Sequence, residues 1–139
     1  MDLFVLDTDI LTLFQRGHAT VVSRVAAHTS DRIAITVVTV EEQLSGWYAE
    51  LRKAKDVERL AWAYQRLAAN VRFLARMEIL DFDQPAIQRY EDLKRRRLKV
   101  RKMDLQIAAI AHESGGILVT RNVQDFKKVP GLIIQDWSK

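Results

Sequence analysis

The residues with the clearest chemical potential in this chain are four acidic side chains that stand far apart in the sequence. They are Asp7, Glu42, Asp104 and Asp125. Each lies at the edge of an apolar segment, where a strand is expected to give way to a helix or a helix to begin. If the fold brings these edges together, the four side chains form a carboxylate cluster. Carboxylates at close range repel one another and are costly to desolvate, so a hard divalent cation usually neutralises such a cluster. The pattern is typical of metal-dependent nucleases.

These acidic residues also have ordinary structural explanations. Asp7 and Asp9 could cap the helix that follows them. Glu42 completes a capping box with Thr39, and on the local pattern alone this explanation is favoured over a metal-binding role. Asp104 has the weakest structural explanation, because it stands in an apolar segment where an uncompensated acid is costly.

The composition indicates an ordinary globular domain. The chain has 139 residues, of which 48% are hydrophobic and 29% are charged, and this balance supports one domain with a substantial core. It has no cysteine, which excludes disulfides and cysteine-ligated zinc. No apolar run approaches the roughly 20 residues of a membrane span, and the N-terminus lacks the pattern of a signal peptide. We therefore expect a single domain over residues 1–139, located in the cytoplasm and without membrane contact.

The net charge of +4 originates in one segment. Seven of the 22 basic residues lie between positions 94 and 102, and the remaining basic residues are outnumbered by the 18 acidic ones. A dense run of Lys and Arg beside a candidate catalytic acid suits a phosphate backbone. The simpler alternative is a solvated helix end and loop. The candidates for nucleic-acid contact in this segment are Arg97, Lys99, Arg101 and Lys102.

Short apolar segments rich in β-branched residues alternate with helical patterns along the chain. Strands are expected at 3–6, 32–35, 79–82, 117–119 and 132–134. Helices are expected at 10–14, 21–28, 40–53, 57–76, 85–96 and 104–113. This alternation predicts an α/β fold in which a parallel sheet of about five strands lies between two layers of helices. Open sheets of this kind place their sites outside the carboxyl ends of the strands, where Asp7 and residues 120–122 are expected.

Four sequence blocks occur in an order that is more specific than any one of them. They are LDTD at 6–9, TVVTVEEQLSG at 36–46, DLQIAAIA at 104–111, and LVTRNVQDF at 118–126, which is followed by VPGL at 129–132 and DW at 136–137. Together they cover nearly the full length of the chain. In this set the chain resembles the PIN-domain ribonucleases and, among them, the VapC toxins of type II toxin–antitoxin systems.

The resemblance implies a three-layer PIN-like fold and a metal-dependent endoribonuclease toxin that hydrolyses RNA phosphodiester bonds to leave a 5′-phosphate. It implies Mg²⁺ or Mn²⁺ as the cofactor, RNA as the substrate, a small VapB-like antitoxin as the partner, and a homodimer. The catalytic residues that it implies are Asp7, Glu42, Asp104, Asn122 and Asp125. Asp7 and Asp104 are expected to bind the metal directly, whereas the other three are expected to act through water. Arg121 is expected to contact the substrate.

The fourth acidic position of the family is divided between two residues here. Many PIN domains have Asp where this chain has Asn122, whereas VapC-like members often have Asn there and an acid at the position of Asp125. An amide can hold a metal-bound water but contributes no charge. Whether one or two metal ions bind is therefore left open.

Two other functions remain open on the sequence. The first is a degenerate PIN domain that binds RNA or a partner without catalysis, because Asn122 weakens the acidic set. The second is a phosphatase of the haloacid dehalogenase type, in which Asp7 would be the nucleophile and Asp9 the acid/base. Against the phosphatase, the fourth strand leads into Thr120-Arg121-Asn122 rather than into an acidic pair. Metal-dependent RNA cleavage separates the three.

The expected helices over 40–53 and 57–76 carry Trp47, Trp62 and Tyr64. The default expectation for an aromatic stripe at helical spacing is the hydrophobic core. The resemblance implies that these two helices also form a surface for a second copy of the chain or for an antitoxin.

Overall fold

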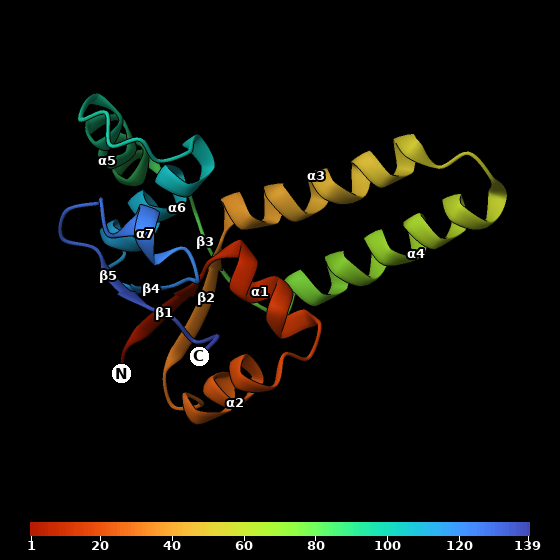
Figure 1. The fold of residues 1–139 in the computed structure, drawn as a ribbon, viewed down its shortest axis with the longest axis horizontal. Coiled ribbons are helices and arrows are strands. Elements are labelled where there is room, and N and C mark those ends of the chain that lie inside the picture. The colour runs from red at the N-terminus through yellow and green to blue at the C-terminus, as the bar shows by residue number, and fades with distance from the viewer.

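The computed structural model, which describes residues 1–139, contains one parallel sheet of five strands. Their bounds are Leu3–Leu6 for β1, Arg32–Thr36 for β2, Glu78–Leu80 for β3, Ile117–Val119 for β4 and Ile133–Gln135 for β5. The spatial order is β3-β2-β1-β4-β5 (Figure 1). The chain therefore builds outward from β1 to β3 on one side and returns to β4 and β5 on the other. Such a reversal beside a central strand is where open α/β sheets place their sites.

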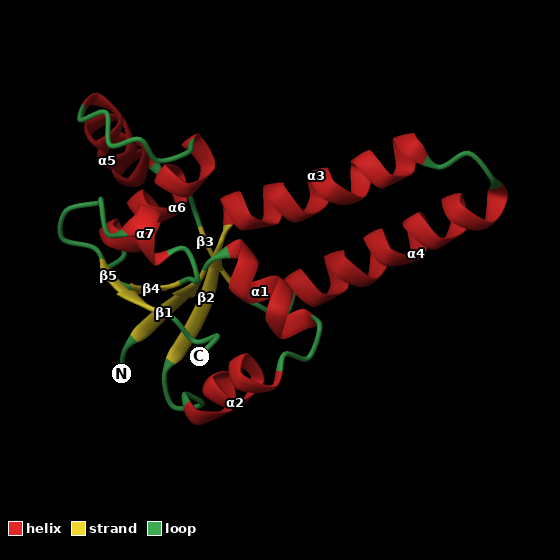
Figure 2. Cartoon of the chain, in the orientation of Figure 1, coloured by secondary structure: helices red, strands yellow, loops and turns green.

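Seven helices surround the sheet (Figure 2). Their bounds are Thr8–Gln15 for α1, Ala19–Ala27 for α2, Val37–Lys53 for α3, Val57–Leu74 for α4, Gln84–Arg95 for α5, Lys102–Glu113 for α6 and Val123–Phe126 for α7. The α3 and α4 helices form a long antiparallel hairpin that projects away from the sheet. None of the seven combines the length and the apolarity that crossing a lipid bilayer requires.

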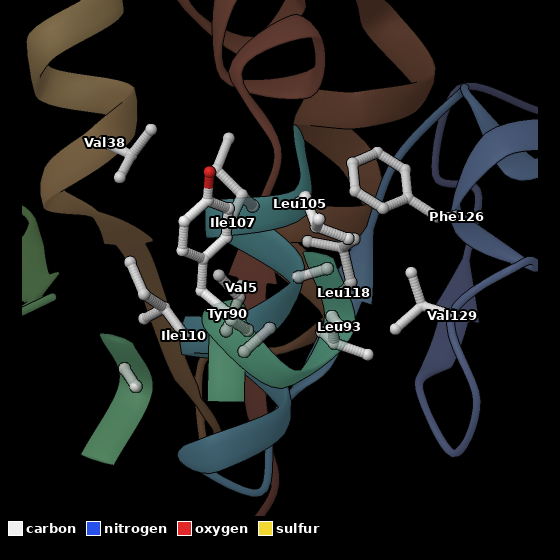
Figure 3. Close-up of a cluster of buried hydrophobic side chains, with 14 of the residues drawn as sticks. Val5, Val38, Tyr90, Leu93, Leu105, Ile107, Ile110, Leu118, Phe126 and Val129 are labelled. Atoms are coloured by element: carbon white, nitrogen blue, oxygen red, sulfur yellow. The ribbon is translucent and has the colours of Figure 1, made fainter. Parts of the chain in front are cut away.

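Alternation along β1 divides the hydrophobic core between the two faces of the sheet. Val5 packs on one face in a cluster with residues of α5 and α6, including Tyr90 and Ile107 (Figure 3). Phe4 and Leu6 belong to a second cluster that contains residues of α1 and α2 and the fully buried Trp137. Because β1 is covered on both faces, all four of its residues are apolar and buried. The three-layer α/β/α arrangement expected from the sequence is confirmed.

The expected elements are all present, with ends that shift by at most three residues. The most consequential difference is the start of α3. The Thr36 hydroxyl accepts a hydrogen bond from the Thr39 N–H at 3.1 Å, so Thr36 is the N-cap and the helix begins at Val37. The capping box predicted between Thr39 and Glu42 is therefore wrong, and the Glu42 side chain is free of that role. The short helix α7 was not expected, since only four residues form it.

Candidate active site

Asp7 occupies the centre of the site because β1 ends one residue before it. Its backbone N–H continues the sheet ladder by donating to the Val119 carbonyl at 2.9 Å. The two carboxylate oxygens then accept separate hydrogen bonds, one from the Thr8 N–H at 2.8 Å and one from the Thr120 hydroxyl at 2.8 Å. Asp7 is thus the N-cap of α1. This is the structural role that the sequence offered for it beside metal binding. It is only 5% exposed and has no cationic partner among the ion pairs of the chain.

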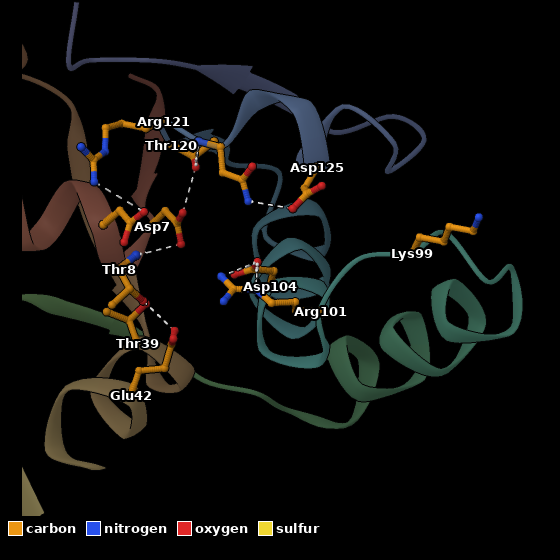
Figure 4. A network of polar contacts seen from close by, with 12 residues as sticks. Asp7, Thr8, Thr39, Glu42, Lys99, Arg101, Asp104, Thr120, Arg121 and Asp125 are labelled. Atoms are coloured by element: carbon orange, nitrogen blue, oxygen red, sulfur yellow. Dashed lines mark hydrogen bonds and ion pairs between the residues drawn. The ribbon is translucent and has the colours of Figure 1, made fainter. Parts of the chain in front are cut away.

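Glu42 reaches the same region from the second turn of α3. Its Oε1 accepts a hydrogen bond of 2.7 Å from the Thr8 hydroxyl, which is also 3.0 Å from the Thr39 hydroxyl. Since the single Thr8 hydroxyl proton points to Glu42, Thr39 must donate to Thr8. The result is a chain of hydrogen bonds, Thr39 to Thr8 to Glu42, that ends on a carboxylate and holds Glu42 in place (Figure 4).

Asp104 lies in the first turn of α6, where a carboxylate is favoured by the helix dipole. Its side chain is 7% exposed and is contacted by Arg101, whose Nε and one terminal nitrogen lie 3.2 and 3.1 Å from the same oxygen, Oδ2. The Arg101 side chain itself is 80% exposed. The charge of the largely buried Asp104 is therefore compensated by an arginine whose side chain lies mostly in solvent.

Asp125 of α7 and Asn122, the N-cap of that helix, form the outer part of the site. The Asn122 amide donates to Asp125 Oδ2 at 3.0 Å, and the Lys128 ammonium lies 3.2 Å from Oδ1. These contacts hold the pKa of Asp125 below its usual range. Asp125 is therefore a stable carboxylate whose two oxygens are both engaged.

The carboxyls near the centre show the opposite electrostatic behaviour. Burial raises the pKa of Asp7 to about 7, and the negative charges of Asp104 and Asp9 contribute to the rise. Burial also raises the pKa of Glu42 and of Asp104, and each is opposed by other acids of the site. The charge of Asp104 acts on both Asp7 and Glu42, and the charge of Asp125 acts on Asp104. The structure thus brings the four acids, which the sequence expected to meet, into electrostatic range of Asp104.

In this arrangement, no three acidic or histidine side chains are close enough to hold an ion between them. Cations of the chain itself lie against the outer acids, with Arg101 on Asp104 and Lys128 on Asp125. The donor set nevertheless fits a hard divalent cation. Asp7 is a buried carboxylate without a cation, and each of its oxygens accepts only one hydrogen bond. Asp104 Oδ1 has no hydrogen-bond partner, so movement of Arg101 would leave a second carboxylate available.

The basic segment lies next to the site, at the turn between α5 and α6. Only Arg101 of this segment contacts an acid of the site, whereas Lys99 extends away from it (Figure 4). Arg97 and Lys99 adopt left-handed backbone conformations, with φ of 51° and 60°. Such conformations are uncommon for residues other than glycine and give this turn a defined shape. Arg121 lies on another side of the site, 3.7 Å from Asp9.

Comparison with models of protein families shows which family contains this chain. The family model described as the PIN domain matches residues 4–132. The chain belongs to the PIN domain family. This membership removes the phosphatase alternative, and with it the reading of Asp7 and Asp9 as a nucleophile and an acid/base.

The proteins that this chain resembles in sequence and in structure include VapC proteins. The chain is 33% identical over 140 residues to the tRNA(fMet)-specific endonuclease VapC of Salmonella typhimurium, covering 96% of this chain and 97% of the relative. It is 37% identical over 71 residues to ribonuclease VapC2 of Rickettsia felis, covering 48% of this chain and 53% of the relative. DNA-bound VapBC from Salmonella typhimurium contains a chain with a TM-score of 0.75 at 30% identity, covering 99% of each chain.

Several residues that support the PIN-domain acids were not predicted from the sequence. Thr8, Thr39 and Thr120 donate the hydroxyl bonds described above, and Lys128 pairs with Asp125. Thr120 directly follows β4 and was expected at this edge, and Thr8 stands two residues after β1, so their bonds to the acids could have been anticipated. Lys128 stands three residues after Asp125, a spacing at which opposite charges meet on a helix.

We expect Thr120→Val to destabilise the protein by about 1–3 kcal/mol, because the buried Asp7 carboxylate loses its hydroxyl donor. The loss should be larger at pH 8 than at pH 5, since an ionised carboxylate needs the donor more than a protonated one. Urea denaturation at the two pH values measures it. Thr120→Ser retains the hydroxyl and is the matched control. Equal stability of the Val variant and the wild type at pH 8 would show that Thr120 does not support Asp7.

Proposed function

We propose that residues 1–139 form a single PIN domain that acts as a Mg²⁺- or Mn²⁺-dependent endoribonuclease toxin in the cytoplasm. The observation that carries the proposal is the buried Asp7 carboxylate, which has no cation of its own and lies within the electrostatic reach of Asp104. An acid is kept in such a place at a cost in stability, and a divalent cation offsets that cost. The relatives named as VapC ribonucleases support RNA as the substrate.

Each acidic residue has a distinct role in this proposal. Asp7 and Asp104 would hold the cation, while Glu42, Asn122 and Asp125 would orient water near it. When bound, the ion would lower the pKa of a water molecule and offset negative charge on the scissile phosphate. Glu42 is suited to accept a proton because burial raises its pKa and the Thr8 hydroxyl fixes its orientation. Asp125 remains ionised, which suits it to hold water rather than to exchange protons.

The exposed basic residues provide the sequence-independent part of RNA binding. Arg97, Lys99 and Lys102 line a shallow cavity of about 310 Å³ between the basic turn and α5. None of the three forms an ion pair with an acid of the site, and Lys99 extends away from the acidic centre (Figure 4). We propose that the RNA backbone runs over this turn, with Arg121 contacting it from the opposite side of the centre. Affinity should then fall steeply with salt concentration.

The α3–α4 hairpin offers the surface for a protein partner. A groove of about 570 Å³ lies between this hairpin and α1 and is lined by Trp47, Trp62, Arg16 and Arg66, among others. The two tryptophan rings lie 5.4 Å apart in an edge-on arrangement. Asn70 also lines the groove, and its side-chain nitrogen is buried without a hydrogen-bond partner. A groove that combines two aromatic rings with polar and basic side chains fits a peptide that brings both apolar and polar or acidic side chains.

We propose that this groove binds a small VapB-like antitoxin and that the same helices contribute to a homodimer. The DNA-bound VapBC structure from Salmonella typhimurium supports a partner of this kind. Exposed apolar residues along α4, which include Val57, Tyr64 and Val71, extend the surface beyond the groove. The expectation that the aromatic residues of this stripe belong to the core is wrong for Tyr64, which is 56% exposed.

Replacing both groove tryptophans tests the partner surface. We expect Trp47→Ala with Trp62→Ala to weaken antitoxin binding at least a hundredfold, because buried aromatic residues dominate interface energies. Isothermal titration with the cognate VapB-like antitoxin measures the affinity, and light scattering measures the dimer. Ile133→Ala removes an exposed apolar residue of the β5 edge, far from the hairpin, and is the control. Unchanged affinity in the double variant would place the partner elsewhere.

Cleavage of RNA by the purified protein tests the catalytic proposal. We expect cleavage in Mg²⁺ or Mn²⁺, loss of cleavage in excess chelator, and recovery when the metal is restored. The products should carry a 5′-phosphate. RNA binding without any cleavage would support the remaining alternative, a degenerate PIN domain that only binds.

A further inference from the structure

Arg101 lies between the acidic centre and the surface proposed to bind RNA, so its side chain could contact either of them. Its guanidinium contacts Asp104 Oδ2 through two nitrogens, and its side chain is 80% exposed. Figure 4 shows it on the side of α6 that faces Asp7 and Glu42. It also belongs to the basic segment proposed to bind RNA, and no other residue of that segment contacts an acid of the site.

The backbone of Arg101 is fixed while its side chain is not. The Arg101 carbonyl accepts the hydrogen bond from the Leu105 N–H at 2.9 Å that starts α6, so the residue is anchored as the N-cap. Its side chain makes no capping bond. Apart from the contact with Asp104, nothing in the chain holds the guanidinium. It can therefore leave Asp104 by rotation of its own side chain, without cost to the helix.

A divalent cation at Asp104 and the Arg101 guanidinium would compete for the same carboxylate. The guanidinium compensates the charge of Asp104, which is largely buried, when no ion is bound. An ion bound at Asp104 would take over this role, and its charge would repel the guanidinium. Arginine that is released next to the acidic centre is well suited to bind a phosphate, because its planar donors match phosphate oxygens.

We propose that Arg101 is a two-position residue that rests on Asp104 in the metal-free protein and moves to the RNA phosphate when the metal binds. This inference rests on the proposed function, since it requires a metal ion at Asp104. Metal binding thereby increases the number of cationic contacts available to RNA. The chain thus couples RNA affinity to metal loading through one side chain.

Metal and RNA affinities of Arg101→Gln test the proposal. We expect its Mn²⁺ dissociation constant, measured by calorimetry, to be about three- to tenfold lower than that of the wild type, because the competing guanidinium is gone. Arg121→Gln removes an equal charge from the same site, where Arg121 lies near Asp9 instead. It is the matched control and should change the Mn²⁺ affinity less than twofold. Equal effects of the two variants would mean that only general electrostatics operates and would overturn the proposal.

Binding of a nuclease-resistant phosphorothioate oligoribonucleotide provides the second readout, by fluorescence anisotropy with and without Mn²⁺. Loss of Arg101 should weaken binding at least fivefold with Mn²⁺ and less than twofold without it, whereas Lys99→Gln should weaken binding equally in both conditions. Equal weakening of Arg101→Gln in both conditions would overturn the proposal. If the wild type binds no Mn²⁺, the proposed function fails as well; if it binds Mn²⁺ and Arg101→Gln does not differ, only the two-position role fails.

Discussion

Asp7→Asn is expected to lower the rate of RNA cleavage by about a thousandfold or more, which corresponds to roughly 4 kcal/mol of transition-state stabilisation. Asp7 is the buried carboxylate at the end of β1 and the proposed ligand of the metal. An asparagine retains one oxygen to cap α1 by accepting from the Thr8 N–H, so the fold should survive. Asp104→Asn is expected to have a comparable effect. Both variants should also relieve the growth arrest caused by expression of the wild type.

Asp9→Asn is the control for this experiment. Asp9 stands two residues from Asp7 and loses the same charge, but its side chain is 60% exposed and lies near Arg121. Its cleavage rate should stay within a few-fold of the wild type. Full activity of Asp7→Asn would refute the assignment of the catalytic centre. A large loss of cleavage rate in Asp9→Asn, with full activity of Asp7→Asn, would assign the catalytic centre to α1 instead.

The metal-free protein is expected to lose stability as the pH rises from 4 to 7, because the pKa of Asp7 rises from 3.8 to about 7 on folding. Between these values the folded protein holds a proton that the unfolded chain releases, so folding is favoured at low pH. The cost is fully present above pH 7 and amounts to a few kcal/mol. Asp7→Asn removes it and should raise the melting temperature at pH 8 by about 5–10 °C. Saturating Mn²⁺ should stabilise the wild type and have little effect on this variant.

Asp125 is the control, because folding lowers its pKa whereas folding raises the pKa of Asp7. Its pKa is held low by Asn122 and Lys128, so its charge is favoured by the fold, and Asp125→Asn should not raise the melting temperature. Thermal scans of both variants at pH 5 and pH 8 without metal make the comparison. At pH 5 the advantage of Asp7→Asn should shrink, because wild-type Asp7 is then mostly protonated. Lower stability of Asp7→Asn than of the wild type at pH 8 would show that Asp7 has a structural role.

The fold was predictable because its signals are local and repeated. Apolar runs such as 3–6 and 117–119 alternate with helical stripes, and this alternation leaves few arrangements other than a covered parallel sheet. Asp7 could be placed for the same reason, since it directly follows the first strand. Family membership is confirmed by the match over residues 4–132. The start of α3 was misjudged because Thr36 and Thr39 are equally good caps in sequence, and only the end of β2 selects Thr36.

The contacts that support the acids, ion pairs and hydrogen bonds alike, were not predictable from sequence. That Arg101 lies on Asp104 depends on where α6 begins, and the sequence pattern placed that start two residues too late. The bond from Thr120 to Asp7 joins residues 113 positions apart. Such contacts follow from the register of β1 against β4, in which Leu6 lies opposite Val119. The sequence indicates which strands exist but not this register.

The position of Mn²⁺ in crystals of the wild-type protein tests the central claim most directly, because anomalous diffraction locates the ion without reference to activity. The account predicts a Mn²⁺ peak within about 2.0–2.6 Å of carboxylate oxygens of both Asp7 and Asp104, with the Arg101 guanidinium moved away from Asp104. A Mn²⁺ ion bound only elsewhere, in crystals grown under conditions that support RNA cleavage, would contradict it.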